Sequence, residues 1–466
     1  MIKKGSITVY LTLVMLLIFA ILFTLLEGVR YQGQRVNAEI ISMAAADSVF
    51  AEYNRQLLER YEIFALDGAY SGSGFDIEAV NYRLGNNARA NSGSGLFAFP
   101  DIITSIPAYR LLTDDEGEPY VKMACEYMKG KLAVEALKKA VSICGDIDEE
   151  DLSLSSALKN IEKGDGALSD DSYKSEEECV AVTEEEKEMA GCVPAEDMGI
   201  LKKVLEIKRQ GVLGLVIDDA SDISSKAADL SRAVSKRSLR KGTHNEDSGI
   251  NAGDDLIFTA YLGDKFGYYG HEREGSALDY EIEYICEGRN TDRANLEKVA
   301  ETLVALREAV NLAKDIKDSQ KMQRARIVAI AIAGIFVVPE LIGIIQMAVI
   351  TAWAFMESID DVKALFAGKK LSDFESGNIQ LGYKEYLEMI LFIKSRKTRV
   401  YRSLDIMEIN IRQEEWYGNF AADNMIVGID WKAGFTTGRV FAGLLGTVSF
   451  FARSYTIEKE GYYTYE

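Results

Sequence analysis

The architecture of this chain is decided by residues 7–26, ITVYLTLVMLLIFAILFTLL, a stretch of twenty residues without a charged side chain. Fourteen of the twenty are Ile, Leu, Val or Phe. As an α-helix that rises about 1.5 Å per residue, the stretch would be about 30 Å long, which matches the hydrocarbon core of a bilayer. It therefore predicts a transmembrane helix. The residues expected to anchor the chain in the membrane are Ile7, Leu11, Val14, Ile18, Leu22 and Leu26.

The residues on either side of this helix predict its orientation. The basic leader, residues 1–6, contains Lys3 and Lys4, and Glu27 follows the apolar stretch directly. Basic flanks stay on the cytoplasmic side of a membrane, so we expect a single-pass protein with a cytoplasmic N-terminus and its bulk outside the cell. A cleaved secretory signal is the alternative, but the apolar part is longer than is usual in such signals and no small-x-small cleavage site follows it.

A helical pattern continues beyond the membrane segment. No proline interrupts residues 27–66, so we expect one helix of about 60 residues in which residues 27–66 form an extracytoplasmic stalk. Apolar residues recur at helical spacing at Val36, Ile40, Met43, Phe50, Leu57 and Tyr61. Small residues that permit close helix approach are Ala38, Ser42, Ala45 and Ala46. The stalk packs either on its own domain or against a partner.

A second apolar run spans residues 327–355 and is long enough for another membrane helix. Pro339 and Glu340 divide it, basic residues at 321–326 precede it, and acidic residues at 357–361 follow it. A segment that entered the membrane from outside would then have its basic flank outside, against the positive-inside rule. We therefore expect a buried helical hairpin in the outer domain. Glu340 should lie at the turn or be paired, because a lone buried carboxylate costs several kcal/mol.

The outer region divides by composition. Residues 67–145 and 196–466 are expected to form one α+β body, interrupted by an acidic insertion at residues 146–195. Sixteen of the forty-five residues 146–190 are Asp or Glu, against four lysines. Such a block is typical of a solvated, mobile insertion. Calcium binding is the functional alternative, but the aspartates at 165–171 do not have the spacing of an EF-hand loop.

Five cysteines allow two local disulfide bonds outside the cell. Cys125 with Cys144 would bracket one predicted helix, and Cys179 with Cys192 would bracket part of the acidic insertion. Cys286 would be left unpaired. Reduced thiols are the alternative, and the spacing of the cysteines does not distinguish the two states.

Hydrophobic periodicity predicts a mostly helical α+β fold: a transmembrane and stalk helix, then one large extracytoplasmic body that contains the buried hairpin. Helices are expected at residues 201–216, 227–239, 295–317 and 381–411, and strands at residues 61–66, 278–286 and 454–466. The strand at 278–286 is predicted from the alternation of Tyr280, Ile282 and Tyr284.

The composition disfavours several classes of function. A formal net charge of −20 repels nucleic-acid phosphates. His244 and His271 are the only two histidines in the sequence, so we expect no His-based metal site and no cofactor. Catalytic motifs such as a Walker loop, Gly-x-Ser-x-Gly or His-Glu-x-x-His do not occur. Glu281 and Glu283 would share one face of a predicted strand, as in a glycosidase or metal site, but 73 acidic residues make such pairs expected by chance. We therefore expect no enzyme.

Short segments of the chain resemble two groups of proteins. KGSITVYLTL at residues 4–13, with the helical continuation over residues 36–47, resembles the minor pilins and pseudopilins of tight-adherence (Tad) pili, the TadE, TadF and TadG group. DYEIEYI at residues 279–285, AWAFMES at 352–358 and GKK at 368–370 resemble an uncharacterised membrane-anchored family of clostridial Firmicutes. That family tends to be encoded with Tad-type pilus machinery.

The pilin resemblance implies a processing site and a role. It places leader cleavage between Gly5 and Ser6, which would leave the apolar helix in the mature protein. The sequence departs from the prepilin pattern at Tyr10, because prepilins usually carry Glu as the fifth mature residue. The implied role is a structural or assembly component of a Tad or type IV-like pilus, with other pilus proteins as partners. A tethered surface adhesin or ligand-binding module is the alternative, and a cell-wall hydrolase is a second alternative.

Overall fold

The computed structural model covers most of the chain. The described residues are 5–70, 72, 74–131, 182–217, 223–244, 249–336, 342–372, 380–441 and 454–465. They are mostly helical with a minority of strand, which confirms the predicted α+β class. The chain divides into two compact units where one outer body was expected. Unit 1 contains residues 1–124, 238–250 and 411–466, and unit 2 contains residues 125–237 and 251–410.

The first helix of unit 1 is shorter than predicted. The helix α1 (Gly5–Phe50) ends well before residue 66, and α2 (Arg55–Tyr61) follows after a break. The Asn54 side chain accepts a hydrogen bond of 3.0 Å from a backbone N–H in the first turn of α2 and so caps that helix. The Asn54 backbone N–H donates to the carbonyl oxygen of Ala65 at 2.8 Å. The prediction of one helix through residues 27–66 is therefore wrong, because Asn54 starts a new helix.

A four-stranded antiparallel sheet completes unit 1. Its strands are β1 (Leu66–Asp67), β2 (Asp101–Leu111), β5 (Met425–Gly438) and β6 (Ser454–Thr464). The central strand is β5, with β2 paired along one edge and β1 and β6 paired along the other. Pro107 lies where the register of β2 shifts, which suits an outer strand because proline cannot donate to the ladder. The C-terminal strand predicted at residues 454–466 is confirmed by β6.

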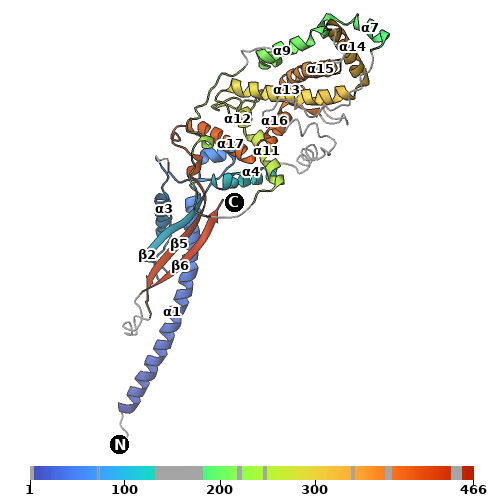
Figure 1. Ribbon diagram of the computed structural model, residues 1–466. Coiled ribbons are helices and arrows are strands. Elements are labelled where there is room, and N and C mark those ends of the chain that lie inside the picture. The colour runs from blue at the N-terminus through green and yellow to red at the C-terminus, as the bar shows by residue number, and fades with distance from the viewer. Residues whose placement is uncertain are drawn as a thin grey trace. The chain divides into compact units, whose positions relative to one another are not determined.

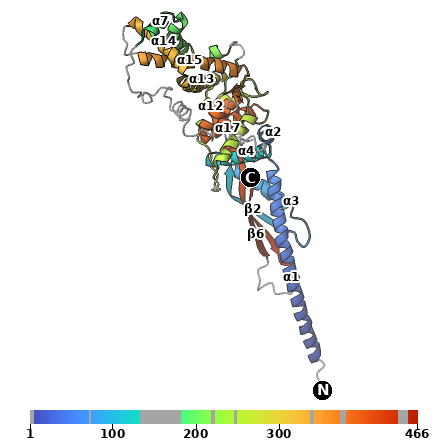
Figure 2. The same ribbon diagram turned by 90° about the vertical axis from the view of Figure 1, so that its right-hand side faces the viewer.

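The core of unit 1 lies between one face of this sheet and two helices, α1 and α3 (Ile77–Ala90). Figures 1 and 2 show α1 lying along the strands, with its N-terminal half extending past the end of the sheet. The rings of Phe50 and Tyr463 lie 4.5 Å apart, and the Tyr465 hydroxyl donates to the Phe50 carbonyl oxygen. The C-terminal strand is thereby fixed to the end of α1. The short elements η1 (Asp114–Glu116) and η5 (Ala422–Asn424) and the start of α4 (Glu118–Lys131) also belong to unit 1.

Unit 2 is built from helices. They are α7 (Glu184–Ala190), α8 (Ala195–Met198), α9 (Ile200–Gln210), α10 (Leu213–Val216), η3 (Val234–Lys236), α11 (Ala252–Lys265), α12 (Glu281–Glu287), α13 (Asp292–Lys317), α14 (Ser319–Phe336), α15 (Ile342–Phe366), α16 (Tyr383–Ile393) and α17 (Arg396–Arg412). A two-stranded ribbon of β3 (Leu371–Ser372) and β4 (Gln380–Leu381) accompanies them. The helix α13 confirms the prediction at residues 295–317, and α9 and α10 account for residues 201–216.

The structure corrects several predicted elements. Residues 278–286, predicted as a strand, contain the helix α12. All six residues from Glu281 to Cys286 are buried, and an element that is buried on every side shows no helical period in its sequence. Residues 227–239 hold only the 3-10 turn η3 instead of a helix, and residues 381–411 form the two helices α16 and α17. Of the strand predicted at 61–66, only Leu66 belongs to β1.

The apolar run at residues 327–355 corresponds to the end of α14 and the start of α15. These helices pack on each other through a core that contains Ala325, Val328, Val349 and Ile350. Figure 1 shows α13 alongside α15, and ten residues of α15 are buried. The predicted hairpin is thus present as two packed helices, whereas Glu340, expected at its turn, lies outside the described residues.

Candidate functional site

The N-terminal half of α1 carries the predicted membrane anchor. Five of the six predicted anchor residues are exposed along this bare half of the helix, and Val14 is half-buried. By length and composition, α1 and α15 are the two helices among the described residues that are apolar enough to cross a bilayer. None of the most apolar window of α1 is buried, against 44% of that window in α15. The anchor prediction therefore fits α1 better than α15. Gly5 and Ser6 form the first turn of α1.

A polar clamp of Glu27, Arg30, Gln34 and Thr437 joins α1 to the end of β5, directly after the uncharged stretch of residues 7–26. Arg30 Nη1 lies 3.1 Å from Glu27 Oε1, and Arg30 Nη2 donates to Thr437 Oγ1 at 3.0 Å. Gln34 Nε2 donates to the same hydroxyl oxygen at 3.0 Å. Arg30 and Gln34 are buried, so their polar groups are satisfied inside the protein. The sequence analysis missed this clamp, although a Glu, an Arg and a Gln at spacings of three and four residues on one helix face were a usable signal.

The loop before β2 is also tied to α1. Arg30 Nε donates to the Leu96 carbonyl oxygen at 2.7 Å, and Asn37 Nδ2 donates to the Phe97 carbonyl oxygen at 3.1 Å. Gly33 lies under the Phe97 ring, where a Cβ would come within 2.4 Å of a ring carbon. The loop therefore lies close to α1 at this level because Gly33 has no side chain.

Beyond the clamp, α1 has two different faces. Its buried face against the sheet is made mostly of small residues, including Ala38, Ser42, Ala45 and Ala46. The outer face of α1, defined by Val29, Val36, Ile40 and Met43, is exposed by 69%, 60%, 60% and 55%. The small residues expected to permit close approach thus serve the protein's own sheet. The larger residues of the predicted apolar stripe, apart from Phe50, Leu57 and Tyr61, face outward.

The acidic pair Glu281 and Glu283 lies in α12, where a separation of two residues turns the side chains in different directions. Glu281 accepts hydrogen bonds from the Gly267 N–H at 2.7 Å and from Asn410 Nδ2 at 2.7 Å. Both carboxylates are almost completely buried. The face that a glycosidase or metal site would need does not form, because the element is a helix.

Glu283 is held in a similar way. Its Oε1 accepts hydrogen bonds from the Tyr269 N–H at 2.9 Å and from the Tyr383 hydroxyl at 2.7 Å. Its Oε2 is buried and meets no hydrogen-bond partner among the described residues. The pKa of Glu283 is raised to about 7, mainly by burial; hydrogen bonds, including those from Tyr269 and Tyr383, lower it, and the charge of Asp292 adds a smaller rise. The carboxyl group fixes the loop at residue 269 and the helix α16 to α12, which is a structural role.

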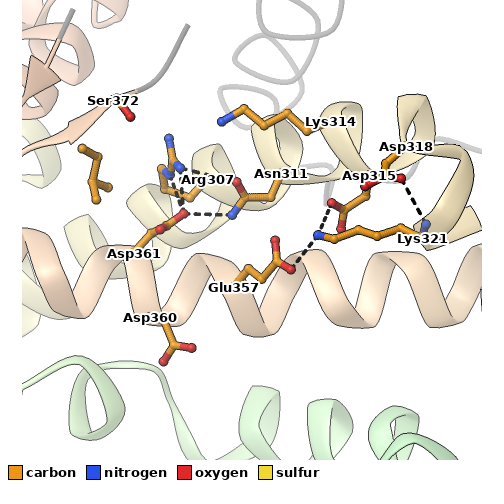
Figure 3. Close-up of a pocket in the computed structure, with 11 residues that line it drawn as sticks. Arg307, Asn311, Lys314, Asp315, Asp318, Lys321, Glu357, Asp360, Asp361 and Ser372 are labelled. Carbon is orange, nitrogen blue, oxygen red and sulfur yellow. Dashed lines mark hydrogen bonds and ion pairs between the residues drawn. The ribbon is translucent and has the colours of Figure 1, made fainter. Parts of the chain in front are cut away.

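A polar cleft of about 570 Å³ lies on unit 2 and is lined mainly by α13 and α15 (Figure 3). Arg307 Nη2 donates to Asp361 Oδ2 at 2.7 Å, and Asn311 Nδ2 donates to the same oxygen at 2.9 Å. Lys321 Nζ lies 2.5 Å from Asp315 and 2.7 Å from Glu357. These pairs cancel charge across the cleft and hold the two helices together. Because these ion pairs join its two walls, we interpret the cleft as a charged contact between helices.

The predicted disulfide and calcium sites fall largely outside the described residues. Cys144 and Cys179 lie there, as does the acidic insertion up to residue 181. Cys125 is a buried free thiol whose Sγ lies 3.2 Å from the Asp254 carbonyl oxygen, and Cys192 is an exposed free thiol. Within the described part of the chain, no group of three or more His, Cys, Asp and Glu residues is placed to hold a metal ion.

The end of the predicted acidic insertion forms a helix of unit 2. Residues 184–190 form α7, which begins at a capping box between Thr183 and Glu186. Glu186 also accepts a hydrogen bond of 2.9 Å from Arg326 Nε of α14. This part of the predicted insertion therefore has a capped helix and an ion pair to α14.

Comparison with known proteins finds a similarity in the C-terminal part of the chain. The sequence profile of one family matches residues 193–378 and 371–437, which together span just over half of the 466 residues. The matched region covers most of unit 2 and nearly all of β5. No curated protein and no solved structure matches the chain. The family is described only as one of unknown function, in agreement with the expectation of an uncharacterised family. This chain therefore belongs to the family of unknown function DUF5702.

Proposed function

We propose that this protein is a membrane-anchored, extracytoplasmic structural or assembly component linked to a Tad or type IV-like pilus. In this proposal, α1 holds the chain in the membrane and its outer face contacts helices of neighbouring subunits. The single observation that carries the proposal is that the outer face continues the apolar surface of the membrane segment along α1, while the sheet occupies the opposite face.

The outer face suits a helix partner. Its residues Val29, Val36, Ile40 and Met43 are separated by seven, four and three residues, so they lie within an arc of about 60° around the helix axis. One partner helix covers a stripe of this width. Fully burying a Val, Ile or Met side chain stabilises by about 1.5–3 kcal/mol, so contact along the stripe would contribute several kcal/mol to association. If α1 and a partner helix meet inside the membrane, the outer face would keep them in contact outside it.

The remaining parts of the proposal rest on the sequence. The basic leader with Lys3 and Lys4 favours a cytoplasmic N-terminus, and the resemblance of residues 4–13 to Tad minor pilins supports the link to a pilus. The resemblance of residues 279–285, 352–358 and 368–370 to a membrane-anchored clostridial family also supports this link. N-terminal sequencing of protein from native membranes tests the processing step. A chain that begins at Ser6 supports a pilin-like fate, an intact Met1 supports an unprocessed anchor, and a start after Leu26 contradicts the anchor.

Site-specific photo-crosslinking in native membranes tests the outer face. A photoreactive phenylalanine analogue at Ile40 should produce a discrete adduct, and mass spectrometry should identify its partner as a pilus component or a second copy of this chain. The matched control is Ser48, which is exposed on another side of α1 and whose hydroxyl donates to the Ala44 carbonyl oxygen of the same helix. Adducts in equal yield from both positions, or none from Ile40, would overturn the proposed role of the outer face.

A further inference from the structure

We infer that unit 1 also docks on the outer surface of the lipid bilayer through an apolar rim at one end of its sheet. The apolar rim consists of Leu96 and Phe97, from the loop before β2, and Val440 and Phe441, directly after β5. This inference rests on the proposed membrane anchor. It adds a second lipid contact, made by the globular part of unit 1, to the contact made by α1 itself.

The hydrogen bonds of the clamp place the rim beside the end of the membrane segment. The Phe441 N–H donates to Glu27 Oε2 at 2.8 Å, and Glu27 is the residue that follows the uncharged stretch. The Phe441 ring stacks on Phe23, with centroids 6.5 Å apart, so it lies against a side chain of the membrane segment itself. The carbonyl oxygen of Leu96 is held by Arg30, three residues beyond Glu27. At about 1.5 Å per residue, Phe441 is level with the last turns of α1 inside the membrane. The loop of Leu96 and Phe97, which contacts Arg30, Gly33 and Asn37, is level with the first turns of α1 outside it.

Polar groups at this end of unit 1 turn inward while apolar side chains turn outward. Arg30 is 6% exposed and is neutralised by Glu27. In contrast, Leu96, Phe97 and Val440 are exposed by 53%, 45% and 42%. Exposed apolar side chains beside the end of a membrane segment are stabilised when they enter the boundary between headgroups and acyl chains, where aromatic rings are also enriched. The arrangement therefore fits a lipid surface better than water.

The sequence after β5 agrees with lipid contact. Residues 440–452, VFAGLLGTVSFFA, carry no charged side chain and are flanked by Arg439 and Arg453. Arginines at both ends of an apolar segment are typical of a segment at the membrane interface, because their side chains reach the headgroups. Residues 442–453 lie outside the described part of the chain, so the rim is defined by its four described residues alone.

Tryptophan quenching in vesicles tests the rim with the full chain. Leu96→Trp and Val440→Trp are made separately, and each variant is reconstituted in phosphatidylcholine vesicles with and without phosphatidylcholine brominated near the carboxyl end of its acyl chains. The emission of the parent chain, which contains Trp353, Trp416 and Trp431, is subtracted. Leu16→Trp, inside the membrane segment, is the positive control. Tyr53→Trp is the negative control, because it lies beyond the other end of α1, roughly 40 Å from Leu26 along the axis.

The four variants separate failure of the rim from failure of the anchor. We expect the added emission of Leu96→Trp and Val440→Trp to shift to the blue and to be lost in part with brominated lipid, while Tyr53→Trp is unchanged. If Leu16→Trp is quenched but both rim variants behave like Tyr53→Trp, the rim does not touch lipid and the inference is overturned with the anchor intact. If Leu16→Trp itself is not quenched, the proposed anchor and the rim both fail. Both rim positions are exposed, so a folding defect in one variant would leave the other as a test.

Discussion

The Arg30 guanidinium donates a hydrogen bond of 3.0 Å to the Thr437 hydroxyl, and the two residues are 407 positions apart in the chain. The same guanidinium donates to the carbonyl oxygens of Leu96 and Gly438 at 2.7 Å and 2.8 Å. Hydrogen bonds from an ionised donor are stronger than neutral ones, and these are shielded from water. They fix the end of the sheet at one level on α1, directly above the apolar segment.

Replacing Arg30 with Met should therefore loosen this end of the sheet. The change leaves the Glu27 carboxylate without its cation and removes the donor to the carbonyl oxygens of Leu96 and Gly438, whereas Thr437 still accepts from Gln34. We expect this to cost about 2 kcal/mol or more. Hydrogen exchange of the β5 amides near Thr437, followed by mass spectrometry, should be faster by roughly thirty-fold. The control is Arg55→Met, because Arg55 and its partner Glu59 are exposed and that pair should not affect β5. Unchanged exchange in the Arg30 variant would rule out the clamp.

The two faces of α1 should respond in opposite ways to substitution. Ala38 is fully buried against the sheet, so Ala38→Leu should overpack the core and lower the free energy of unfolding of unit 1 by about 1–3 kcal/mol. Ile40 is 60% exposed, so Ile40→Ala should change that free energy by less than about 0.5 kcal/mol. Pulse proteolysis in urea on the detergent-solubilised chain measures the free energy of unfolding of both variants. A larger loss in the Ile40 variant would mean that the faces are assigned the wrong way round.

The stability of unit 2 should depend on the protonation of Glu283. Its pKa in the folded protein is about 7, above the ordinary value of 4.5, so the folded state binds this proton more tightly than the unfolded state. The stabilising contribution is complete below pH 4.5 and is lost as the pH rises through about 7. It is on the order of 3 kcal/mol.

Glu283→Gln isolates this contribution, since the amide can still accept from Tyr269 and Tyr383 and cannot ionise. The other buried acids of unit 2 with a raised pKa, among them Glu281, Asp292 and Asp405, remain in the variant. We expect wild type to lose more stability than the variant between pH 5 and pH 8 in urea unfolding of unit 2. Parallel pH profiles of the two proteins would show that Glu283 titrates normally.

The Arg307 and Asp361 pair should stabilise the contact between α13 and α15. Arg307 is 3% exposed, so Asp361→Ala leaves a buried guanidinium without its carboxylate and should cost about 3 kcal/mol. The neighbour Asp360 is exposed and points away from Arg307 (Figure 3), which makes Asp360→Ala a matched control within about 0.5 kcal/mol of wild type. Hydrogen exchange of the α13 amides measures the effect of each substitution. Equal exchange in the two variants would mean that the pair contributes nothing.

The exposed thiol of Cys192 offers a test of orientation. If unit 2 lies outside the cell, a membrane-impermeant maleimide should label Cys192 in intact cells, and Cys192→Ser should lose that label. A membrane-impermeant phosphine reductant is added first, so that a disulfide bond with Cys179 does not hide the thiol. Cys125 and Cys286 are buried and should react only after denaturation. Labelling of Cys192 that requires lysis would place unit 2 in the cytoplasm.

Local features of the sequence were enough to predict the parts of the fold that depend on near neighbours. The uncharged stretch at residues 7–26 predicts an apolar helix because it is uniformly apolar over one bilayer thickness. The helix α13 and the strand β6 follow from their hydrophobic periodicity, which is a property of consecutive residues.

Tertiary structure alone decided which side of α1 is buried and what the acidic pair does. The sheet approaches α1 closely, so it selects the small side chains at Ala38 and Ala45 and leaves Val36 and Ile40 outside, although the larger residues have the stronger hydrophobic pattern. Because α12 is buried on all sides, its sequence has no helical period, and the alternation of Tyr280, Ile282 and Tyr284 predicted a strand. The Arg30 and Thr437 contact depends on residues that meet only when the sheet folds onto α1, and no local pattern encodes a contact between such distant positions.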